Sequence, residues 1–237
     1  MEDEMRAMQR NVEIIRTNMA MAAHQAGRRP EEIKLCAACK TRSVETVRAS
    51  AGLDIDLFGE NHVQELVEKT DAGAYLGKPG HFIGHLQTNK IKRVLGRASL
   101  IESVDSVHLL LSLEQAAAKM NLTQDILIEV NIGQEKSKTG IDAEGLWPLL
   151  ELAAAQNHLA VRGLMAIPPA DANELQNRAY FAKMRTLFER ADALHYRNVS
   201  MQILSMGMSE DYQNAILEGS TLVRIGTAIF GARKEQG

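Results

Sequence analysis

Lys40 is the residue of this chain whose position most clearly suggests chemistry. It ends a strand-like run, IKLCAACK, in which alternate side chains point to opposite faces. Cys36, Ala38 and Lys40 therefore share one face, and we expect that face to be buried. Burial favours the neutral form of an amine, and a neutral lysine can attack an aldehyde or ketone to form a Schiff base. The alternative is a lysine whose amine reaches solvent beyond the end of the strand.

Two segments near the other end of the chain have the composition of an anion site. They are LSMGMS at 204–209 and RIGT at 224–227, which combine hydroxyls, small side chains and approachable backbone N–H groups. The residues concerned are Ser205, Gly207, Ser209, Gly226 and Thr227. Ser209 also precedes a predicted helix at 210–218, and the N-terminus of a helix favours an anion. The pattern predicts a phosphate-binding loop.

Arg224 lies directly before the second of these segments. In TLVRIGT the side chains of Leu222, Arg224 and Gly226 fall on one face, so the guanidinium is expected inside the fold. A buried guanidinium needs a partner. That partner is either a carboxylate, Glu129 or Glu102, or the ring nitrogen of a bound pyridine. Because arginine only donates hydrogen bonds, such a nitrogen stays unprotonated and the ring is a weaker electron sink.

Eight short apolar runs alternate with helical patterns along the chain. The runs lie at 33–40, 56–60, 81–84, 100–104, 126–131, 161–167, 203–207 and 221–226. The helical patterns lie at 4–26, 61–70, 87–97, 106–119, 143–156, 173–195 and 210–218. The runs recur at the length of a βα unit with no linker-like segment between them. This predicts an α/β fold: a single (β/α)8 TIM-type barrel over 1–237, with an extra N-terminal helix at 1–27 packed on it.

Closure of such a barrel places the last strand beside the first. Active sites of these barrels lie at the C-terminal ends of the strands. Lys40 ends the first run, and the predicted phosphate loop begins at the end of the eighth. A phosphate held there would bring an attached aldehyde within reach of Lys40, so we predict the binding site at this edge.

Composition and charge argue against several classes of partner. The formal charge of −3 gives no electrostatic reason to expect nucleic acid or an acidic membrane surface. The basic cluster at 90–97 is interpreted as the solvent face of a helix. No run approaches the roughly 20 apolar residues that span a bilayer, and the N-terminus lacks the features of a secretory signal. With only two cysteines, a reducing cytoplasm is the expected location.

The pattern of cysteines and histidines also argues against redox and metal sites. Cys36 and Cys39 form a C-x-x-C motif, but in a strand their thiols point to opposite faces. His81 and His85 are four residues apart, a spacing that does not converge on a metal from a strand and a loop. We therefore expect neither a metal nor a redox pair.

Seven ordered motifs resemble those of the pyridoxal phosphate homeostasis proteins, and they span essentially the whole chain. They are CKT at 39–41, FGENHVQE at 58–65, HFIGHLQTNK at 81–90, VNIGQEKSKTG at 130–140, RGLMAI at 162–167, LSMGMSEDYQNAI at 204–216 and VRIGTAIFGAR at 223–233. The resemblance implies a fold similar to the N-terminal barrel of alanine racemase. It also implies a carrier or regulator of the vitamin B6 pool that holds pyridoxal 5′-phosphate as a Schiff base on Lys40.

The same resemblance implies a set of cofactor contacts. These are Ser205, Gly226 and Thr227 for the phosphate, Arg224 for the ring nitrogen, and Asn61 facing the cofactor. The chain departs from the family at Cys39, where serine is common. Because this side chain is predicted to face away from the cofactor, we expect little effect on binding.

Three functions are compatible with this site, and a carrier without turnover is favoured. A racemase needs two bases. In the racemases that the chain resembles, the second base is a tyrosine from a C-terminal domain that we expect to be absent here. Tyr212 is then the candidate for a second base. A cofactor-free aldolase leaves Arg224 without a partner and predicts a colourless protein. The expected partners are pyridoxal phosphate and apoenzymes that use it, and the expected state is a monomer. Lys136 and Lys138 are interpreted as solvated loop lysines, a less favoured second place of attachment.

Overall fold

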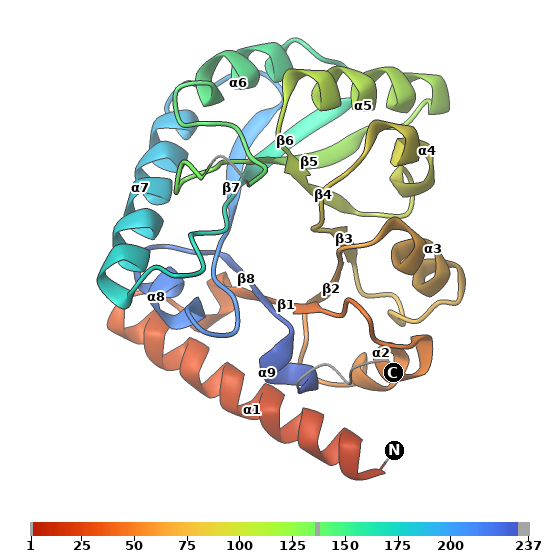
Figure 1. The fold of residues 1–237 in the computed structure, drawn as a ribbon, viewed down its shortest axis with the longest axis vertical. Coiled ribbons are helices and arrows are strands. Elements are labelled where there is room, and N and C mark those ends of the chain that lie inside the picture. The colour runs from red at the N-terminus through yellow and green to blue at the C-terminus, as the bar shows by residue number, and fades with distance from the viewer. Residues whose placement is uncertain (1, 136–137, 232–237) are drawn as a thin grey trace.

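The computed structural model describes residues 2–135 and 138–231 of the 237-residue chain. Within these ranges eight parallel strands pair in sequence order, and β1 also pairs with β8, which closes the barrel. The helices surround the strands (Figure 1). The predicted (β/α)8 barrel with an additional helix before the first strand is therefore confirmed.

Every predicted run overlaps a strand. The strands are β1 Lys34–Ala38, β2 Leu57–Glu60, β3 Gly80–Phe82, β4 Leu100–Val104, β5 Gln124–Glu129, β6 Leu159–Met165, β7 Val199–Ser205 and β8 Leu222–Ile225. The helices are α1 Glu2–Gln25, α2 Val44–Ser50, α3 Val63–Asp71, α4 Ile91–Val94, α5 Val107–Met120, α6 Leu146–Ala154, α7 Glu174–Asp192, α8 Tyr212–Leu217 and α9 Thr227–Phe230. Two 3-10 turns are η1 Pro30–Glu32 and η2 Thr88–Lys90.

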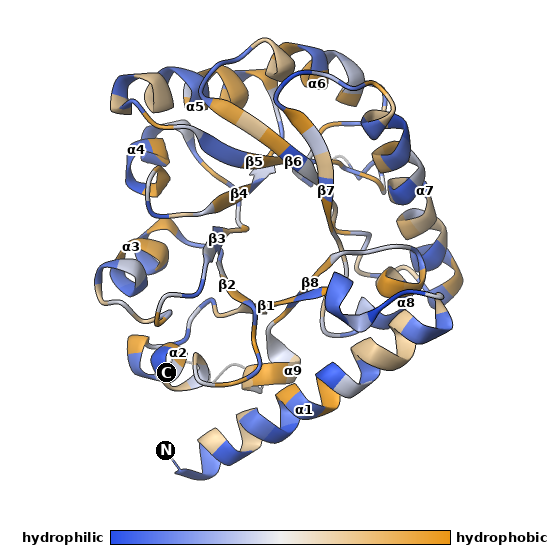
Figure 2. Cartoon of the chain, turned by 180° about the vertical axis from the view of Figure 1, so that it is seen from behind, coloured by the Kyte–Doolittle hydropathy of each residue, from blue (hydrophilic) through white to orange (hydrophobic). Residues whose placement is uncertain are grey.

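Alternate residues of a strand face the inside of the barrel or the surrounding helices, as the period of two predicts. On β1, Cys36 packs with Leu57 and Leu222 in a small apolar cluster. Leu35 and Ala37 belong instead to a larger cluster shared with the helices. In Figure 2 hydrophobic colour appears on strands such as β6 and β7 and in patches along the helices, whereas β5 and β8 also carry hydrophilic colour. Because burial stabilises each large apolar side chain by roughly 1.5–3 kcal/mol, the layer between strands and helices dominates the stability of the fold.

Helix α1 runs along the outside of the barrel, past α8, α9 and α2 (Figure 1). Its buried side chains, spaced by three and four residues, are Met8, Val12, Ile15, Met19, Ala22 and Ala23. Asn11 Nδ2 donates a hydrogen bond of 3.0 Å to the Ile229 carbonyl. Asn18 Nδ2 donates one of 3.1 Å to the Tyr212 hydroxyl. The helix thus holds the segments that follow β7 and β8.

Two helices, α2 and α9, lie outside the predicted helical ranges. They have seven and four residues, too few for an apolar face to recur along the sequence. The beginning of α2 is stabilised by a cap, since Ser43 Oγ accepts from the Thr46 N–H at 3.2 Å. Within residues 2–135 and 138–231, no helix combines the length and the apolar character that crossing a bilayer requires.

Candidate functional site

A cavity of about 220 Å³ lies where β8 and β1 end. Its wall is formed by Ala38, Lys40, Arg42, Met208, Ser209, Glu210, Arg224, Gly226 and Thr227. Four predicted site residues, Lys40, Arg224, Gly226 and Thr227, therefore meet in one place. Closure of the barrel brings them together, because Cys36 on β1 is in register with Arg224 on β8.

Gly226, which follows β8, lies close to the end of β1. A Cβ atom on this residue would lie 2.9 Å from the Ala38 carbonyl oxygen and 3.5 Å from the Ala38 Cβ. A larger residue would therefore push β8 away from β1 at the cavity floor. Glycine at this position is a structural requirement of the site.

The loop between β7 and α8 forms another wall of the cavity. The Arg224 N–H donates to the Gly207 carbonyl at 2.9 Å, which ties this loop to β8. Ser209 Oγ accepts from the Ala228 N–H at 3.2 Å, which ties the same loop to α9. The hydroxyls of Ser209 and Thr227 are the side-chain hydroxyls on the cavity wall within the described residues.

Arg224 belongs to a buried polar group inside the barrel, which we call the interior cluster: His81, Glu102, Ser205 and Arg224. One guanidinium nitrogen donates to Ser205 Oγ and lies 3.8 Å from Glu102 Oε2. The other terminal nitrogen donates to the Ala166 carbonyl at 3.0 Å. Arg224 also lines the cavity. The sequence left open whether this arginine pairs with a carboxylate or faces a ligand. In the structure it pairs with the Glu102 carboxylate, and it also lines the cavity.

Glu102 is the anion of the interior cluster. It is fully buried and accepts from Ser205, and His81 Nδ1 lies 2.7 Å from its Oε1. Burial by itself raises the pKa of the Glu102 carboxyl, but the hydrogen bond and charge of His81, with Arg224 and Ser205, outweigh burial and bring the pKa below its ordinary value. A carboxylate in this state is the anionic partner of the Arg224 guanidinium.

Ser205, predicted as a phosphate contact, is not among the described residues that line the cavity. Its side chain is fully buried, donates to Glu102 and accepts from Arg224. It is therefore part of the interior cluster and not of the cavity wall. The reason is parity: Ser205 is the last residue of β7 and points into the barrel, whereas Ser209 follows in the loop above it.

Asn61 was expected to face the cofactor, and Glu129 was one of two expected partners of Arg224. Asn61 follows β2 and is absent from the cavity wall, and its backbone oxygen lies only 2.1 Å from where a Cβ on Gly84 would be placed. Glu129, one of the two predicted partners of Arg224, accepts from Thr139 Oγ1 at 2.7 Å. Of the two carboxylates, it is Glu102 that pairs with Arg224.

All four tyrosines lie within the described residues, and none of them lines the cavity. Tyr212, the stand-in for a second base, is buried under α1, where its hydroxyl accepts from Asn18. Lys138 donates to the Pro168 carbonyl at 3.0 Å and pairs with Glu135 at 2.6 Å. Lys136 lies outside the described residues. No group of three or more His, Cys, Asp or Glu able to hold a metal ion occurs within the part of the chain that the structure describes.

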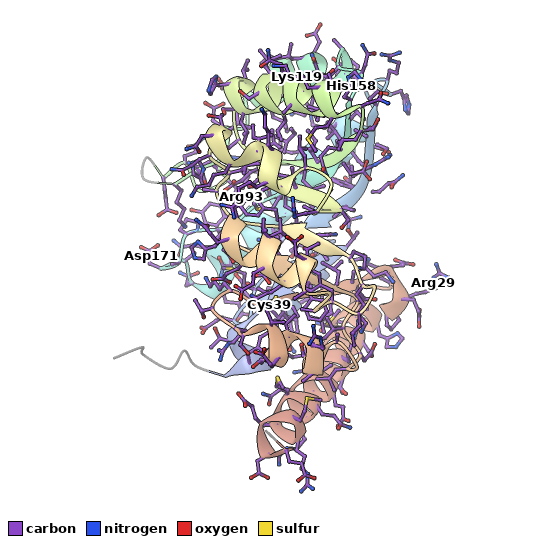
Figure 3. The ribbon with its side chains drawn as sticks, turned by 90° about the vertical axis from the view of Figure 1, so that its right-hand side faces the viewer. Arg29, Cys39, Arg93, Lys119, His158 and Asp171 are labelled. Atoms are coloured by element: carbon purple, nitrogen blue, oxygen red, sulfur yellow. The ribbon has the colours of Figure 1, made fainter. Side chains whose placement is uncertain are left out.

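A second buried polar group, which the sequence did not predict, lies on the opposite side of β1. We call it the exterior cluster: Cys39, Glu60, Lys69 and Tyr75. Lys69 Nζ lies 2.9 Å from the Glu60 carboxylate, and the Tyr75 hydroxyl and the Cys39 thiol both donate to Glu60, at 3.2 and 2.8 Å. Figure 3 views the molecule from this side and labels Cys39. The one available signal was spacing, since Val63, Leu66 and Lys69 recur every three residues on the buried face of α3.

Comparison with known proteins assigns this barrel to a family. The chain matches the alanine racemase N-terminal domain family over residues 6–234. An alanine racemase of Clostridium difficile superposes with a TM-score of 0.76 at 14% identity, covering 99% of this chain and 61% of the racemase. This likeness shows the fold alone.

Closer similarities narrow the assignment. The chain is 43% identical to the pyridoxal phosphate homeostasis protein of Aquifex aeolicus, over 90% of this chain and 92% of the relative. A structure of PipY from Synechococcus elongatus with PLP bound superposes with a TM-score of 0.78 at 29% identity, covering 90% of this chain and 100% of PipY. The chain belongs to the family of pyridoxal phosphate homeostasis proteins.

Proposed function

We propose that this protein binds pyridoxal 5′-phosphate in the cavity between β8 and β1, holds it covalently on Lys40 and takes part in the homeostasis of that cofactor. The observation that carries the proposal is the meeting of Lys40, Arg224 and a hydroxyl-bearing glycine turn in one small cavity. PipY, a relative over its whole length, is known with PLP bound.

The residues present fit the chemical groups of this cofactor. Its phosphate suits the hydroxyls of Ser209 and Thr227 and the approachable backbone at Gly226. Its ring nitrogen suits the guanidinium of Arg224, and its aldehyde suits the amine of Lys40. Ser205 contributes indirectly by bonding Arg224, while Asn61, at the end of β2, remains a contact predicted from its motif. When bound, pyridoxal phosphate supplies an aldehyde that condenses with amines and a ring that withdraws electrons.

The cavity favours holding the cofactor over turning over a substrate. Arg224 pairs with Glu102 and can only donate to a ring nitrogen, which limits the electron-withdrawing power of the ring. Racemisation also needs a second base on the opposite face of the substrate carbon, and Tyr212 is committed to Asn18 beneath α1. We therefore propose a carrier without catalytic turnover.

The proposal extends to partners and location. A cofactor held by a reversible bond can pass to apoenzymes that use pyridoxal phosphate, which we propose as recipients. Both cysteines are free and buried, which suits a reducing cytoplasm. We propose a monomer as the working form, because an isolated barrel of this kind need not dimerise.

Borohydride reduction of the purified protein tests the attachment site. We expect a yellow protein whose reduced cofactor maps to the peptide that carries Lys40. Lys40→Ala should lose the colour and the label, whereas the matched variant Lys138→Ala should keep both, because Lys138 bonds Pro168 and Glu135 away from the cavity wall. A label found only on Lys138 or Lys136 would overturn the assignment.

Incubation with L-alanine tests the absence of turnover. Loaded protein should yield no more D-alanine than pyridoxal phosphate free in solution. Rapid formation of D-alanine that depends on Lys40 would replace the carrier with a racemase.

A further inference from the structure

Lys40 lies in a tight turn that begins where β1 ends. The Arg42 N–H donates to the Cys39 carbonyl at 3.1 Å, which closes the turn. Thr41, the third residue of the turn, has a φ of 65°. Turns with positive φ at this position usually carry glycine or asparagine, and a β-branched residue is strained there. The turn therefore needs support from outside itself.

Two side chains of α3 supply that support, one on each side of Lys40. Lys69 Nζ donates to the Cys39 carbonyl at 2.8 Å. Glu65 Oε2 accepts from the Thr41 N–H at 2.9 Å. The two side chains are themselves joined, since Lys69 Nζ lies 3.2 Å from Glu65 Oε2. The residues before and after Lys40 are thus bound to the same helix.

The exterior cluster anchors this support. Lys69 has a side-chain exposure of 1%, and Glu60, its nearest carboxylate, has 0%. Burial lowers the pKa of the Lys69 ammonium, but Cys39, Glu60 and Glu65 outweigh burial and raise the pKa above its ordinary value. An ammonium group has three hydrogens. Lys69 directs one of them to the Cys39 carbonyl, and its other hydrogen-bond acceptors are the carboxylates of Glu60 and Glu65.

We propose that Glu65 and Lys69 are positioning residues for Lys40: they hold the peptide groups on both sides of it so that its amine is presented to the cavity. Neither side chain is among those that line the cavity. They act through the backbone of Cys39 and Thr41, and the strained φ of Thr41 is maintained by the Glu65 contact. The inference rests on the proposed function only in taking Lys40 as the point of attachment.

Glu65 provides the sharpest test, because its side chain is 22% exposed and its replacement should be tolerated by the fold. Glu65→Leu removes the acceptor for the Thr41 N–H, whereas Glu65→Gln keeps an acceptor oxygen. Glu68→Leu, an exposed position on the same helix, is the matched control. Glu65→Ala replaces Glu65→Leu if the larger side chain prevents folding. Two rates are compared: hydrogen exchange of the Thr41 amide in cofactor-free protein, and attachment of pyridoxal phosphate to Lys40, followed by absorbance.

For Glu65→Leu we expect exchange at Thr41 to rise at least about tenfold as the turn opens locally. Attachment should slow by about tenfold or more, because a misplaced nucleophile reacts more slowly. Glu65→Gln and Glu68→Leu should stay within about twofold of the parent protein, since local opening is unchanged. Parent rates for both measurements in Glu65→Leu would overturn the positioning role. A parent protein that never attaches the cofactor at Lys40 would refute the proposed function instead, while exchange at Thr41 would still report on the turn.

Discussion

The interior and exterior clusters contain the same kinds of group and lie on opposite sides of β1. Each contains a fully buried glutamate, Glu102 or Glu60, paired with a buried cation. The interior cluster ends in Arg224, a side chain that borders the cavity. The exterior cluster ends in Lys69, whose contact beyond the carboxylates is with backbone next to Lys40. One cluster therefore shapes what the cavity can bind, and the other shapes the residue that does the binding.

Burial of charge is therefore not by itself a mark of a ligand site. Replacing a whole buried ion pair by apolar groups is often neutral for stability, whereas removing one partner is costly. Both clusters are thus expected to show strong penalties for single substitutions. They should differ in their effect on the cavity.

The largest effect is expected from breaking the exterior pair. Lys69→Met leaves Glu60 buried without its cation, and we expect the free energy of unfolding to fall by about 3–5 kcal/mol. Urea denaturation measures this change. The double variant Glu60→Leu/Lys69→Met should recover most of the loss, because the carboxylate that remains, Glu65, is partly exposed and no fully buried charge is left uncompensated. A single variant as stable as the parent would show that Glu60 takes up a proton or water without cost.

A smaller, pH-dependent effect is expected from the interior cluster. The pKa of Glu102 is below its ordinary value in the folded protein. The stability that this carboxylate contributes is therefore present above its unfolded pKa of about 4.3 and is lost as the pH falls through the lower folded value. At neutral pH, Glu102→Gln should cost about 1–3 kcal/mol.

Urea titrations of the parent protein and Glu102→Gln across the acid range check this sign. The gap in unfolding free energy between the two proteins should narrow as the pH falls. A constant gap would mean that Glu102 is not ionised at neutral pH. Glu102→Gln should also weaken retention of pyridoxal phosphate. A purely structural ion pair would affect stability and leave retention unchanged.

The smallest effect is expected at Cys39. Cys39→Ser keeps a donor to Glu60, so the unfolding free energy should change by less than about 1 kcal/mol. Burial is the main cause of a pKa for the Cys39 thiol well above its ordinary value, so a thiol reagent should not modify it in the native state. Mass spectrometry before and after denaturation checks this. Rapid native modification would show that the exterior cluster opens to solvent.

Most of the barrel was predictable because its signal is local. Alternation along 33–40 and 221–226 predicts that Cys36 and Arg224 face inward. Cys36 packs with Leu57 and Leu222, and Arg224 contacts Ser205 and Glu102, in agreement with this prediction. The short helices α2 and α9 were not predictable from periodicity. Ser205 shows the limit of motif reasoning, because the residue types of a hydroxyl-rich loop do not reveal which hydroxyl faces the cavity.

The exterior cluster could not be predicted because its partners come from different elements. Cys39 follows β1, Glu60 ends β2, and Lys69 lies on α3. The sequence shows each as an ordinary residue of a strand end or a helix. Only the packing of α3 against the ends of β1 and β2 removes water from all three.

Local periodicity and residue chemistry are enough to predict the alternation of strands and helices, the inward face of β1 and β8, and the chemical types that meet at their ends. The packing of distant segments sets which carboxylate pairs with Arg224, where the Ser205 hydroxyl points and how the Lys40 turn is held. Those outcomes depend on distances between residues far apart in the chain, and a pattern along one strand carries no information about them.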